Sequence, residues 1–354
     1  MSRQRLDAHI PLTELHVHLG AAVTPAIMWG IAHAQGIRLP TKDYWAFRDL
    51  ITVGRRRRGF AAYLELFHWT ELIQSSPTAV ERSVYEVIGG AYRKNNVTQI
   101  ELRFNPMKRN RGGEQDLDHI IAAAVRGMDR AVLEYPQIRA GLIFCLDRGF
   151  SHELNEILAA KAISWRQRGV VAVDIAGPVE PSFHFSDYRD LFAEVRRNGL
   201  GVTIHAGETG GPEEVREAIE SLEPDRIGHG IKSAYDPQVM GMLRERGIVL
   251  EVCPSSNLNT GVVRNLAEVH HIVRSLVDHG VPFTISTDGP EMLRSYLRDE
   301  INLLMRHEIL SLEEARAAVE IGHRASFLDR LPFVEPSRPP GTGNSAAIPV
   351  EAVS

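Results

Sequence analysis

The sequence predicts an α/β fold, a (β/α)8 TIM barrel, because short apolar segments rich in β-branched residues alternate with longer amphipathic segments from residue 12 onward. This alternation is typical of repeated βα units around a parallel sheet. Eight strand-like segments occur, which is the number that closes such a barrel. They cover residues 12–19, 97–104, 139–146, 169–176, 200–206, 226–228, 248–253 and 281–286.

Helical periodicity fills the intervals between these strands and continues after the last one. The predicted helices cover about 80–95, 116–135, 150–167, 186–198, 212–221, 235–246, 263–279, 291–306 and 312–328. A doubly wound open sheet is the rival architecture. It is disfavoured because no strand is followed by a glycine-rich phosphate-binding fingerprint.

The spacing of the segments predicts a single barrel domain over residues 11–332. The long interval at about 20–96, after the first strand, is expected to be an insertion with helices of its own. Residues 333–354 are rich in Pro, Gly, Ser and Ala and have no periodicity, so they are expected to form a disordered tail.

Charge and hydropathy argue against large polyanionic or membrane partners. The formal net charge is −5, and basic residues are dispersed apart from the run Arg55–Arg58, so no nucleic-acid partner is expected. No signal peptide is recognisable and no eighteen apolar residues run together, which predicts a cytoplasmic protein that does not enter membranes. Cys145 and Cys253 lie in apolar runs and are expected to be reduced. Nothing in the sequence indicates an oligomeric state.

The first strand carries two histidines on one face. His16 and His18 are two residues apart, so in a strand both side chains point the same way. Two imidazoles that face one point suit a divalent cation such as zinc. The pair alone is also compatible with two ordinary buried histidines.

Later polar residues strengthen the functional interpretation. His205, Glu208, His229 and Asp288 all lie at or just beyond the C-terminal ends of predicted strands. These ends converge on one mouth of a barrel, where the catalytic groups of barrel enzymes lie. We therefore expect these residues and the two histidines to form one active site that binds a small molecule.

Five short motifs resemble the successive signatures of the adenosine deaminase family. They are HVHL (16–19), TIHAGE (203–208), RIGHGI (226–231), CPSSN (253–257) and STDGP (286–290). The match spans about residues 11–328 and keeps the family's order. The resemblance implies a metal-dependent hydrolase barrel that removes the 6-amino group of an adenine nucleoside, giving a 6-oxo product and ammonia.

The resemblance also implies roles for individual residues. One zinc ion would be held, with a water molecule, by four side chains: His16, His18, His205 and Asp288. Asp288 and His229 would orient the attacking water, and Glu208 would donate a proton to the purine N1. Gly177 matches a glycine whose N–H meets the purine N3, although a tight strand-to-helix turn explains this glycine equally well.

Two positions depart from the family pattern. Family members usually carry an acidic residue that contacts the ribose 5′-hydroxyl where Gly20 stands, and a second aspartate facing the purine N7 where Gly289 stands. We expect His18, Gly20, Gly177 and Gly289 to border the substrate. Losing the first carboxylate favours a nucleoside without a free 5′-hydroxyl, because a buried carboxylate left without a partner is costly.

A 5′-extended substrate of this kind is 6-amino-6-deoxyfutalosine, an intermediate of menaquinone biosynthesis that some relatives of the family deaminate. An arginine of Arg55–Arg58 could pair with its carboxylate tail, unless this run is only a solvated loop. Adenosine itself remains the alternative nucleoside. Free adenine is a further alternative, because loss of the ribose contact is compatible with it.

Neighbouring residues have two interpretations each. Phe67, His68 and Trp69 in the insertion could wall the nucleoside or belong to the core. The end of the second strand could supply substrate contacts or supporting contacts, through Arg103, Asn105, Lys108 and Arg109.

Two other functional classes remain as alternatives. A two-metal hydrolase would use a carboxylated lysine at the end of the fourth strand, but residues 174–177 are Asp-Ile-Ala-Gly. A catalytically silent nucleoside-binding protein is disfavoured because all the predicted metal ligands and both proton-transfer residues are present.

Overall fold

The computed structural model describes residues 5–54, 59–110, 116–178 and 182–330. The run Arg55–Arg58 and the tail at 333–354 therefore lie outside the described residues, and the predictions made for them stay predictions. Among the described helices, none is long and apolar enough to cross a membrane.

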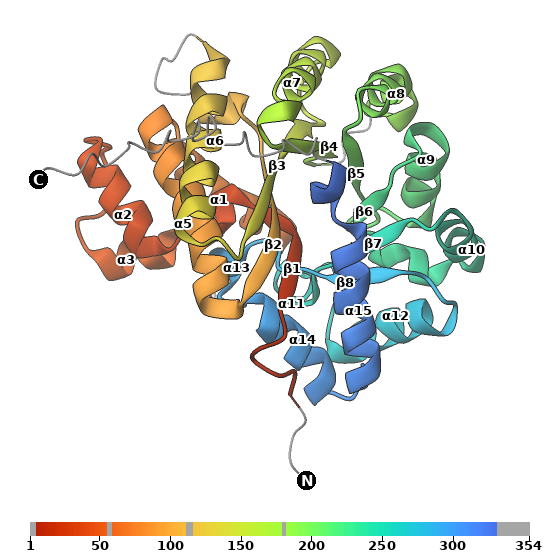
Figure 1. Ribbon diagram of the computed structural model, residues 1–354. Coiled ribbons are helices and arrows are strands. Elements are labelled where there is room, and N and C mark those ends of the chain that lie inside the picture. Colours follow the sequence, from red (N-terminus) through yellow and green to blue (C-terminus); the bar gives the residue numbers. More distant parts are fainter. Residues whose placement is uncertain (1–4, 55–58, 111–115, 179–181, 331–354) are drawn as a thin grey trace, which may run out of the picture.

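Eight parallel strands form the barrel predicted from the sequence (Figure 1). Each strand pairs with the next along the chain, from β1 to β8. A bridge between Val17 and Asp288 closes the ring, because the His18 N–H donates to the Asp288 carbonyl and the Asp288 N–H donates to the His16 carbonyl, both at 2.8 Å. The strands are β1 Leu12–His18, β2 Val97–Phe104, β3 Arg139–Asp147, β4 Val170–Ala176, β5 Gly201–Ala206, β6 Arg226–His229, β7 Val249–Val252 and β8 Phe283–Ile285.

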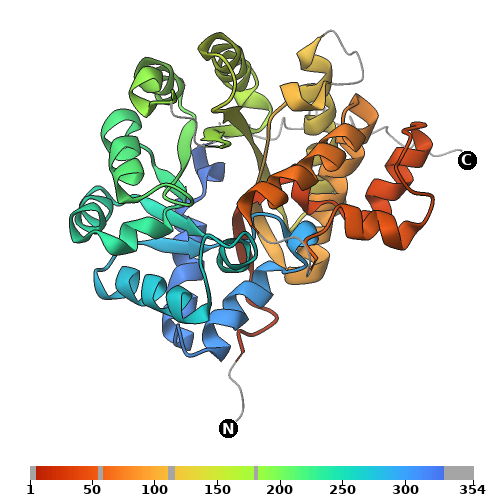
Figure 2. The ribbon, with the colours of Figure 1, turned by 180° about the vertical axis from the view of Figure 1, so that it is seen from behind.

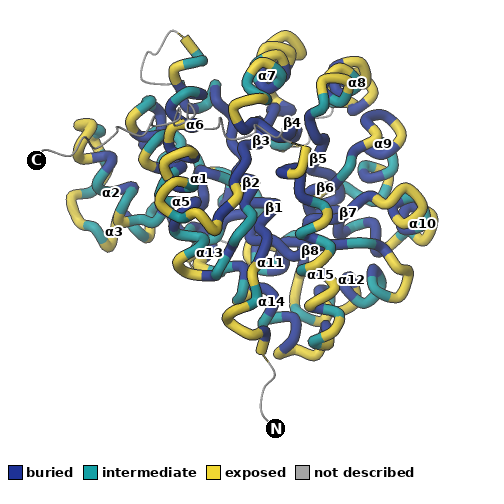
Figure 3. The backbone as a smooth tube through the Cα atoms, in the orientation of Figure 1, coloured by how far each residue is buried: buried dark blue, intermediate teal, exposed yellow. Residues whose placement is uncertain are grey.

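The strands are buried on both faces, as a barrel surrounded by helices requires. Every residue of β5, β6, β7 and β8 is buried. Figure 3 shows the strands as a buried centre and the outward sides of the helices as the exposed surface. Continuous apolar runs rather than alternating ones follow from this double burial, and they explain why the strands could be recognised in the sequence.

Helices that follow the strands form the outer layer (Figure 1). Many begin with a side-chain cap: Asp116, Ser151, Asp236, Asn265 and Ser311 each accept a hydrogen bond from the first turn. The outer helices are α6 Leu117–Glu134, α7 His152–Ser164, α8 Arg189–Arg197, α9 Pro212–Leu222, α10 Pro237–Arg246, α12 Leu266–Asp278, α14 Leu297–Arg306 and α15 Leu312–Ala325. Short 3₁₀ turns lie at Met107–Arg109, Arg166–Arg168, Phe185–Tyr188, Ile231–Tyr235 and Phe327–Arg330.

Two segments differ from the sequence prediction. The helix expected at 291–306 is divided into α13, Pro290–Leu293, and α14, because Arg294 adopts a left-handed conformation with φ of 55° between them. A short helix, α11 at Pro254–Asn259, covers the CPSSN motif. Its six residues span less than two turns, which is too short to leave a helical periodicity.

The insertion after β1 consists of helices, as expected. They are α1 Leu19–Ala22, α2 Pro25–Ala34, α3 Tyr44–Leu50, α4 Phe60–Ile73 and α5 Pro77–Asn95. Helix α5 packs against α6 and β2, so it joins the outer layer of the barrel. Helices α2 and α3 lie at one side of the molecule in both views (Figures 1 and 2), and α4 supplies residues to the mouth of the barrel.

Truncating one core leucine tests the packing of the barrel. Leu142 in β3 is fully buried, so Leu142→Ala is expected to lower the free energy of unfolding by about 2–5 kcal/mol. Leu133 in α6 is 83% exposed, so Leu133→Ala is the matched control and should change it by less than about 0.5 kcal/mol. Urea denaturation measures both, and equal effects would contradict the described burial.

Candidate active site

A cavity of about 370 Å³ opens at the C-terminal ends of the strands. Its walls come from the strand ends, from the turn that follows β2 and from helix α4 of the insertion. His18, His205, Glu208, His229 and Asp288 all line this cavity. The structure therefore brings together side chains that are up to 270 residues apart in the sequence.

Three histidines form a compact cluster at the base of this cavity. His16 and His18 come from β1 and His205 from β5, and one ring nitrogen of each lies within 4.8 Å of the others. The Nε2 atoms of His18 and His205 are 3.2 Å apart. The Asp288 carboxylate lies 3.6 Å from His18 Nε2 and 4.0 Å from His16 Nε2.

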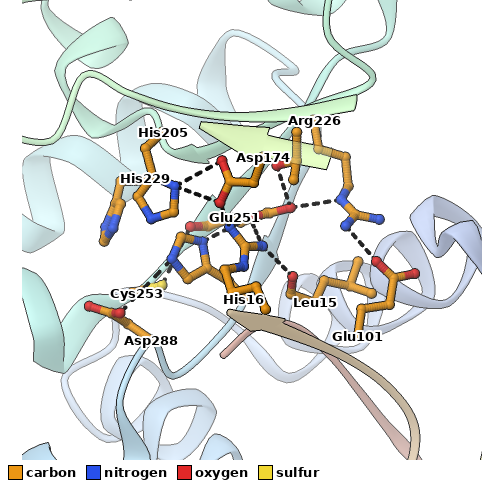
Figure 4. Close-up of polar contacts among 12 residues, drawn as sticks. Leu15, His16, Glu101, Asp174, His205, Arg226, His229, Glu251, Cys253 and Asp288 are labelled. Atoms are coloured by element: carbon orange, nitrogen blue, oxygen red, sulfur yellow. Dashed lines mark hydrogen bonds and ion pairs between the residues drawn. The ribbon is translucent and has the colours of Figure 1, made fainter. Parts of the chain in front are cut away.

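Two buried carboxylates orient two of these rings (Figure 4). Glu251 on β7 lies 2.8 Å from His16 Nδ1, and Asp174 on β4 lies 3.0 Å from His205 Nδ1. An ionised carboxylate only accepts hydrogen bonds, so each Nδ1 carries the proton. The Nε2 lone pairs of His16 and His205 therefore face the cluster.

Arg103 on β2 joins the two carboxylates. Its guanidinium donates to Asp174 at 2.8 Å and to Glu251 at 2.7 Å, and all three side chains are fully buried. Burial alone would raise the pKa of Asp174, but the contacts with His205 and with the Arg103 guanidinium hold it below its ordinary value. Likewise, burial would raise the pKa of Glu251, but Arg103 and Arg226 lower it to about 2. Both carboxylates are therefore ionised at neutral pH.

A second arginine continues this network toward the bottom of the barrel (Figure 4). Arg226 on β6 donates to Glu251 at 2.7 Å and to Glu101 on β2 at 2.6 Å. Thr203 donates to the same Glu251 oxygen at 2.9 Å. Besides Arg103, residues from three other strands contact Glu251. They are His16 on β1, Thr203 on β5 and Arg226 on β6.

The cluster has the properties of a cation site. Burial lowers the pKa of His16 and of His18 well below the ordinary histidine value, so both imidazoles are neutral and can act as ligands. His16 Nε2 is a buried atom without a hydrogen-bond partner among the described residues. A lone pair in that situation beside a carboxylate is costly unless a cation lies between them. Three imidazoles and one carboxylate suit zinc.

Glu208 and His229 lie beside the cluster. His229 Nε2 is 3.7 Å from the Glu208 carboxylate, and both side chains are largely buried. Burial raises the pKa of Glu208 well above its ordinary value, and the charges of Asp288 and Glu214 add to the rise. Burial lowers the pKa of His229 to about 3. Burial thus favours the neutral form of both neighbouring groups.

Local contacts fix His229, the last residue of β6, and Asp288, which follows β8. His229 and Asp288 have φ angles of 59° and 63°, a left-handed conformation that is uncommon outside glycine. Asn257 Nδ2 lies 3.0 Å from His229 Nδ1, and Ser256 donates to Asp288 at 2.5 Å. Helix α11, which contains Ser256 and Asn257, therefore supports both strained residues. Such strain is frequent at functional sites.

The predicted substrate-contacting glycines lie in different surroundings. Gly20 and Gly177 line the cavity, and Gly177 has a φ of 111° that favours glycine. A Cβ at position 20 would lie 2.9 Å from the Phe67 ring and 3.1 Å from Arg109 Nη2. Gly289 directly follows Asp288 in the chain. A Cβ at position 289 would lie 2.8 Å from the Tyr63 hydroxyl.

Other predicted neighbours separate into two groups. Phe67 and His68 line the cavity, whereas Trp69 packs against the hydrophobic core. Arg103 supports the carboxylates described above. It also lines the cavity, as do Asn105, Lys108 and Arg109 of the same stretch.

Sequence reasoning missed Asp174, Glu251 and Tyr63 as parts of the site. The first two had a recognisable signal, because each is a lone charged residue in an apolar strand, in VAVDIA and VLEV. A charge in such a run must be paired inside the protein. Tyr63 had no comparable signal, because aromatic residues are frequent in amphipathic helices.

Comparison with known proteins agrees with this site. A family model described as adenosine deaminase matches residues 11–331. An adenosine deaminase from Clostridium kluyveri is 31% identical over 330 residues, which cover 93% of this chain and 93% of that protein.

Solved structures share the fold. An adenine deaminase from Arthrobacter aurescens superimposes with a TM-score of 0.80 at 21% identity, over 90% of this chain and 97% of that one. An amidohydrolase from Burkholderia ambifaria, with bound zinc, has a TM-score of 0.76 at 22% identity, over 92% and 90% of the two chains. The family model and the Clostridium relative together show that this chain belongs to the adenosine deaminase family and is a hydrolytic deaminase.

Proposed function

We propose that the protein uses zinc to deaminate a 6-aminopurine nucleoside, giving the 6-oxo nucleoside and ammonia. The observation that carries the proposal is the convergence of the histidine cluster with Asp288, Glu208 and His229 in one cavity. Three neutral ligands, one carboxylate and one protonated acid are the groups that hydrolysis of an amino-substituted ring requires.

His16, His18, His205 and Asp288 are the residues that would hold the ion. A divalent cation there lowers the pKa of a water molecule and so supplies a nucleophile near neutral pH. The donor set favours zinc over magnesium or calcium, which prefer oxygen ligands.

Glu208 is proposed to donate a proton to N1 of the purine ring. Its raised pKa favours the protonated carboxyl, which is the form that can donate. Protonation of N1 removes electron density from C6 and makes this carbon a better electrophile. The Gly207 N–H donates to Glu214 at 2.7 Å, and Glu214 pairs with Arg148 at 2.9 Å, so the segment that carries Glu208 is itself held in place.

His229 and Asp288 are proposed to position the attacking water. The Asn257 amide nitrogen donates to His229 Nδ1, which leaves the proton of the neutral ring on Nε2, facing Glu208. His229 thus stabilises negative charge that develops on the water oxygen. Asp288, whose other oxygen accepts from Ser256, is the acceptor for the proton of that water.

We further propose that the nucleoside carries an anionic 5′ extension, as 6-amino-6-deoxyfutalosine does. Phe67 and Arg109 close over Gly20, so an acidic side chain at position 20 would require both to move. Arg109 is buried in the cavity wall with Glu71 at 3.5 Å, and its charge favours a carboxylate or phosphate. The volume lies within the range of about 300–1,000 Å³ of pockets for drug-sized ligands, which favours a nucleoside over a free base.

A panel of substrates tests this choice. Loss of adenine absorbance is followed with adenosine, adenine, 5′-methylthioadenosine and 6-amino-6-deoxyfutalosine, and kcat/KM is compared. We expect the highest kcat/KM for the anionic 5′-extended nucleoside, and Arg109→Met should reduce that preference. Highest activity on adenosine would reject the 5′ extension but keep the reaction. No turnover of any compound by zinc-loaded protein would reject deamination of these purines.

Replacing the proposed proton donor tests the mechanism. Glu208→Gln is expected to lower kcat by about 10²–10⁴-fold, because the amide cannot donate a labile proton to N1. Product binding should be retained, since the side chain keeps its size. Glu213→Gln is the matched control, because Glu213 is exposed in the first turn of helix α9, five residues after Glu208, and its replacement should leave kcat unchanged. A Glu208→Gln enzyme of normal kcat would contradict the assignment.

Replacing a buried carboxylate tests the metal site independently of activity. Asp174→Asn is expected to weaken zinc binding by about 10–100-fold, because the amide orients His205 less strongly and leaves its imidazole less basic. Competition with a chromophoric chelator measures the affinity. Asp329→Asn, whose side chain is 72% exposed, is the control and should bind zinc like the wild type. Equal affinities for all three proteins would show that Asp174 does not support the metal.

A further inference from the structure

Tyr63 in helix α4 presents a buried hydroxyl to the active site. The residue is only 5% exposed, lines the cavity, and packs edge-on against Phe67 with ring centroids 5.4 Å apart. Its hydroxyl makes no well-formed hydrogen bond with the described residues, although the Asp288 carboxylate lies beside it. A buried hydroxyl whose contact with the neighbouring carboxylate is poorly aligned is free to offer its proton to a better-placed acceptor on a ligand.

The space for this hydroxyl exists because position 289 has no side chain. A Cβ on Gly289 would lie 2.8 Å from the Tyr63 oxygen and 2.7 Å from the Ala21 Cβ. The φ of Gly289 is −142°, an extended value that any residue can adopt. The absence of a side chain is therefore explained by the space that Ala21 and Tyr63 take rather than by the backbone.

A purine ring has one polar nitrogen on each side of C6. N1 lies on one side of this carbon, and N7, an acceptor without a proton, lies on the other side across C5. Glu208, proposed to face N1, follows β5, whereas Tyr63 stands over the β8 end beside Asp288. A ring whose C6 lies at the cluster and whose N1 meets Glu208 directs N7 toward the Asp288 side.

We propose that the Tyr63 hydroxyl donates a hydrogen bond to N7 of the bound purine and so positions C6 for attack. The inference rests on the proposed function and deepens it, because it names the residue that distinguishes a purine from a ring with carbon at this position. Tyr63 moves no proton in the reaction and acts as a specificity-determining residue. The alternative is that its hydroxyl serves only Asp288, which predicts no dependence on N7.

Binding of inosine and 7-deazainosine separates these possibilities, because the two product-type ligands differ at position 7 alone. Titration calorimetry on the zinc-loaded protein measures both dissociation constants. We expect the wild type to bind inosine about 3- to 10-fold more tightly, as one hydrogen bond provides. In Tyr63→Phe the ratio should fall to about 1 through weaker binding of inosine. An unchanged ratio in Tyr63→Phe would overturn the proposal.

Two further variants complete the experiment. Gly289→Ala should reduce the same ratio, because its Cβ displaces the hydroxyl, and it tests the proposal even if Tyr63→Phe folds poorly. Tyr188→Phe is the matched control: Tyr188 is also 5% exposed, but its hydroxyl accepts from Asn155 away from the cavity, so the ratio should stay at the wild-type value. A ratio that falls equally in this control would overturn the assignment to Tyr63.

Turnover of adenosine, 5′-methylthioadenosine and 6-amino-6-deoxyfutalosine by the same wild-type preparation separates the two levels of inference. Deamination with no N7 dependence of binding rejects the role of Tyr63 and keeps the proposed function. N7-dependent binding that is lost in Tyr63→Phe, without turnover of any purine nucleoside, rejects the proposed function and keeps the contact.

Discussion

The fully buried ion pairs between Arg103 and the carboxylates of Asp174 and Glu251 are the constraint on which the rest of the site depends. Two carboxylates inside a barrel would be strongly destabilised without a charged partner. One guanidinium satisfies both, since its planar fork offers several donors in fixed directions. The same carboxylates accept from His16 and His205, so β1, β2, β4, β5 and β7 are linked through five side chains.

This linkage divides the barrel interior into two electrostatic layers. The lower layer is fully ionised, with Arg103 and Arg226 holding the pKa of Glu251 down to about 2. The upper layer is largely neutral, because burial lowers the pKa of His229 to about 3 and raises that of Glu208 well above its ordinary value. Neutral imidazoles suit a cation and a neutral carboxyl suits proton donation.

The sequence predicted the barrel well because its strands are buried on both faces and therefore appear as continuous apolar runs. It predicted the grouping of His16, His205 and Asp288 because the ends of parallel strands necessarily converge. It could not predict the break at Arg294 or the short helix over Ser256, since neither leaves a periodic pattern. Asp174 and Glu251 were overlooked although a lone charge in a buried strand is a usable signal.

The contacts of the insertion were the part of the site that the sequence predicted least well. Helix α4 reaches the mouth of the barrel through tertiary packing, and no sequence motif indicates that packing. Gly20 and Gly289 illustrate the reason. Each leaves a space that a side chain from elsewhere fills: Arg109 and Phe67 at position 20, and the Tyr63 hydroxyl at position 289. Viewed as single positions, both glycines look like lost contacts. In three dimensions each glycine is matched by a side chain from another element, and we propose that these side chains take over recognition.

The pairing has a physical consequence for how such a site can change its substrate. His16 and His205 are hydrogen-bonded to the ionised carboxylates, so altering either would remove a hydrogen bond that a buried charge accepts. Arg109 and Tyr63 are not part of that ionised layer. Recognition groups in the insertion and after β2 can therefore be exchanged without disturbing His16 or His205. The proposed reaction thus depends on residues that cannot be replaced independently of the ionised network. The proposed choice of substrate depends on side chains outside that network, which can be replaced.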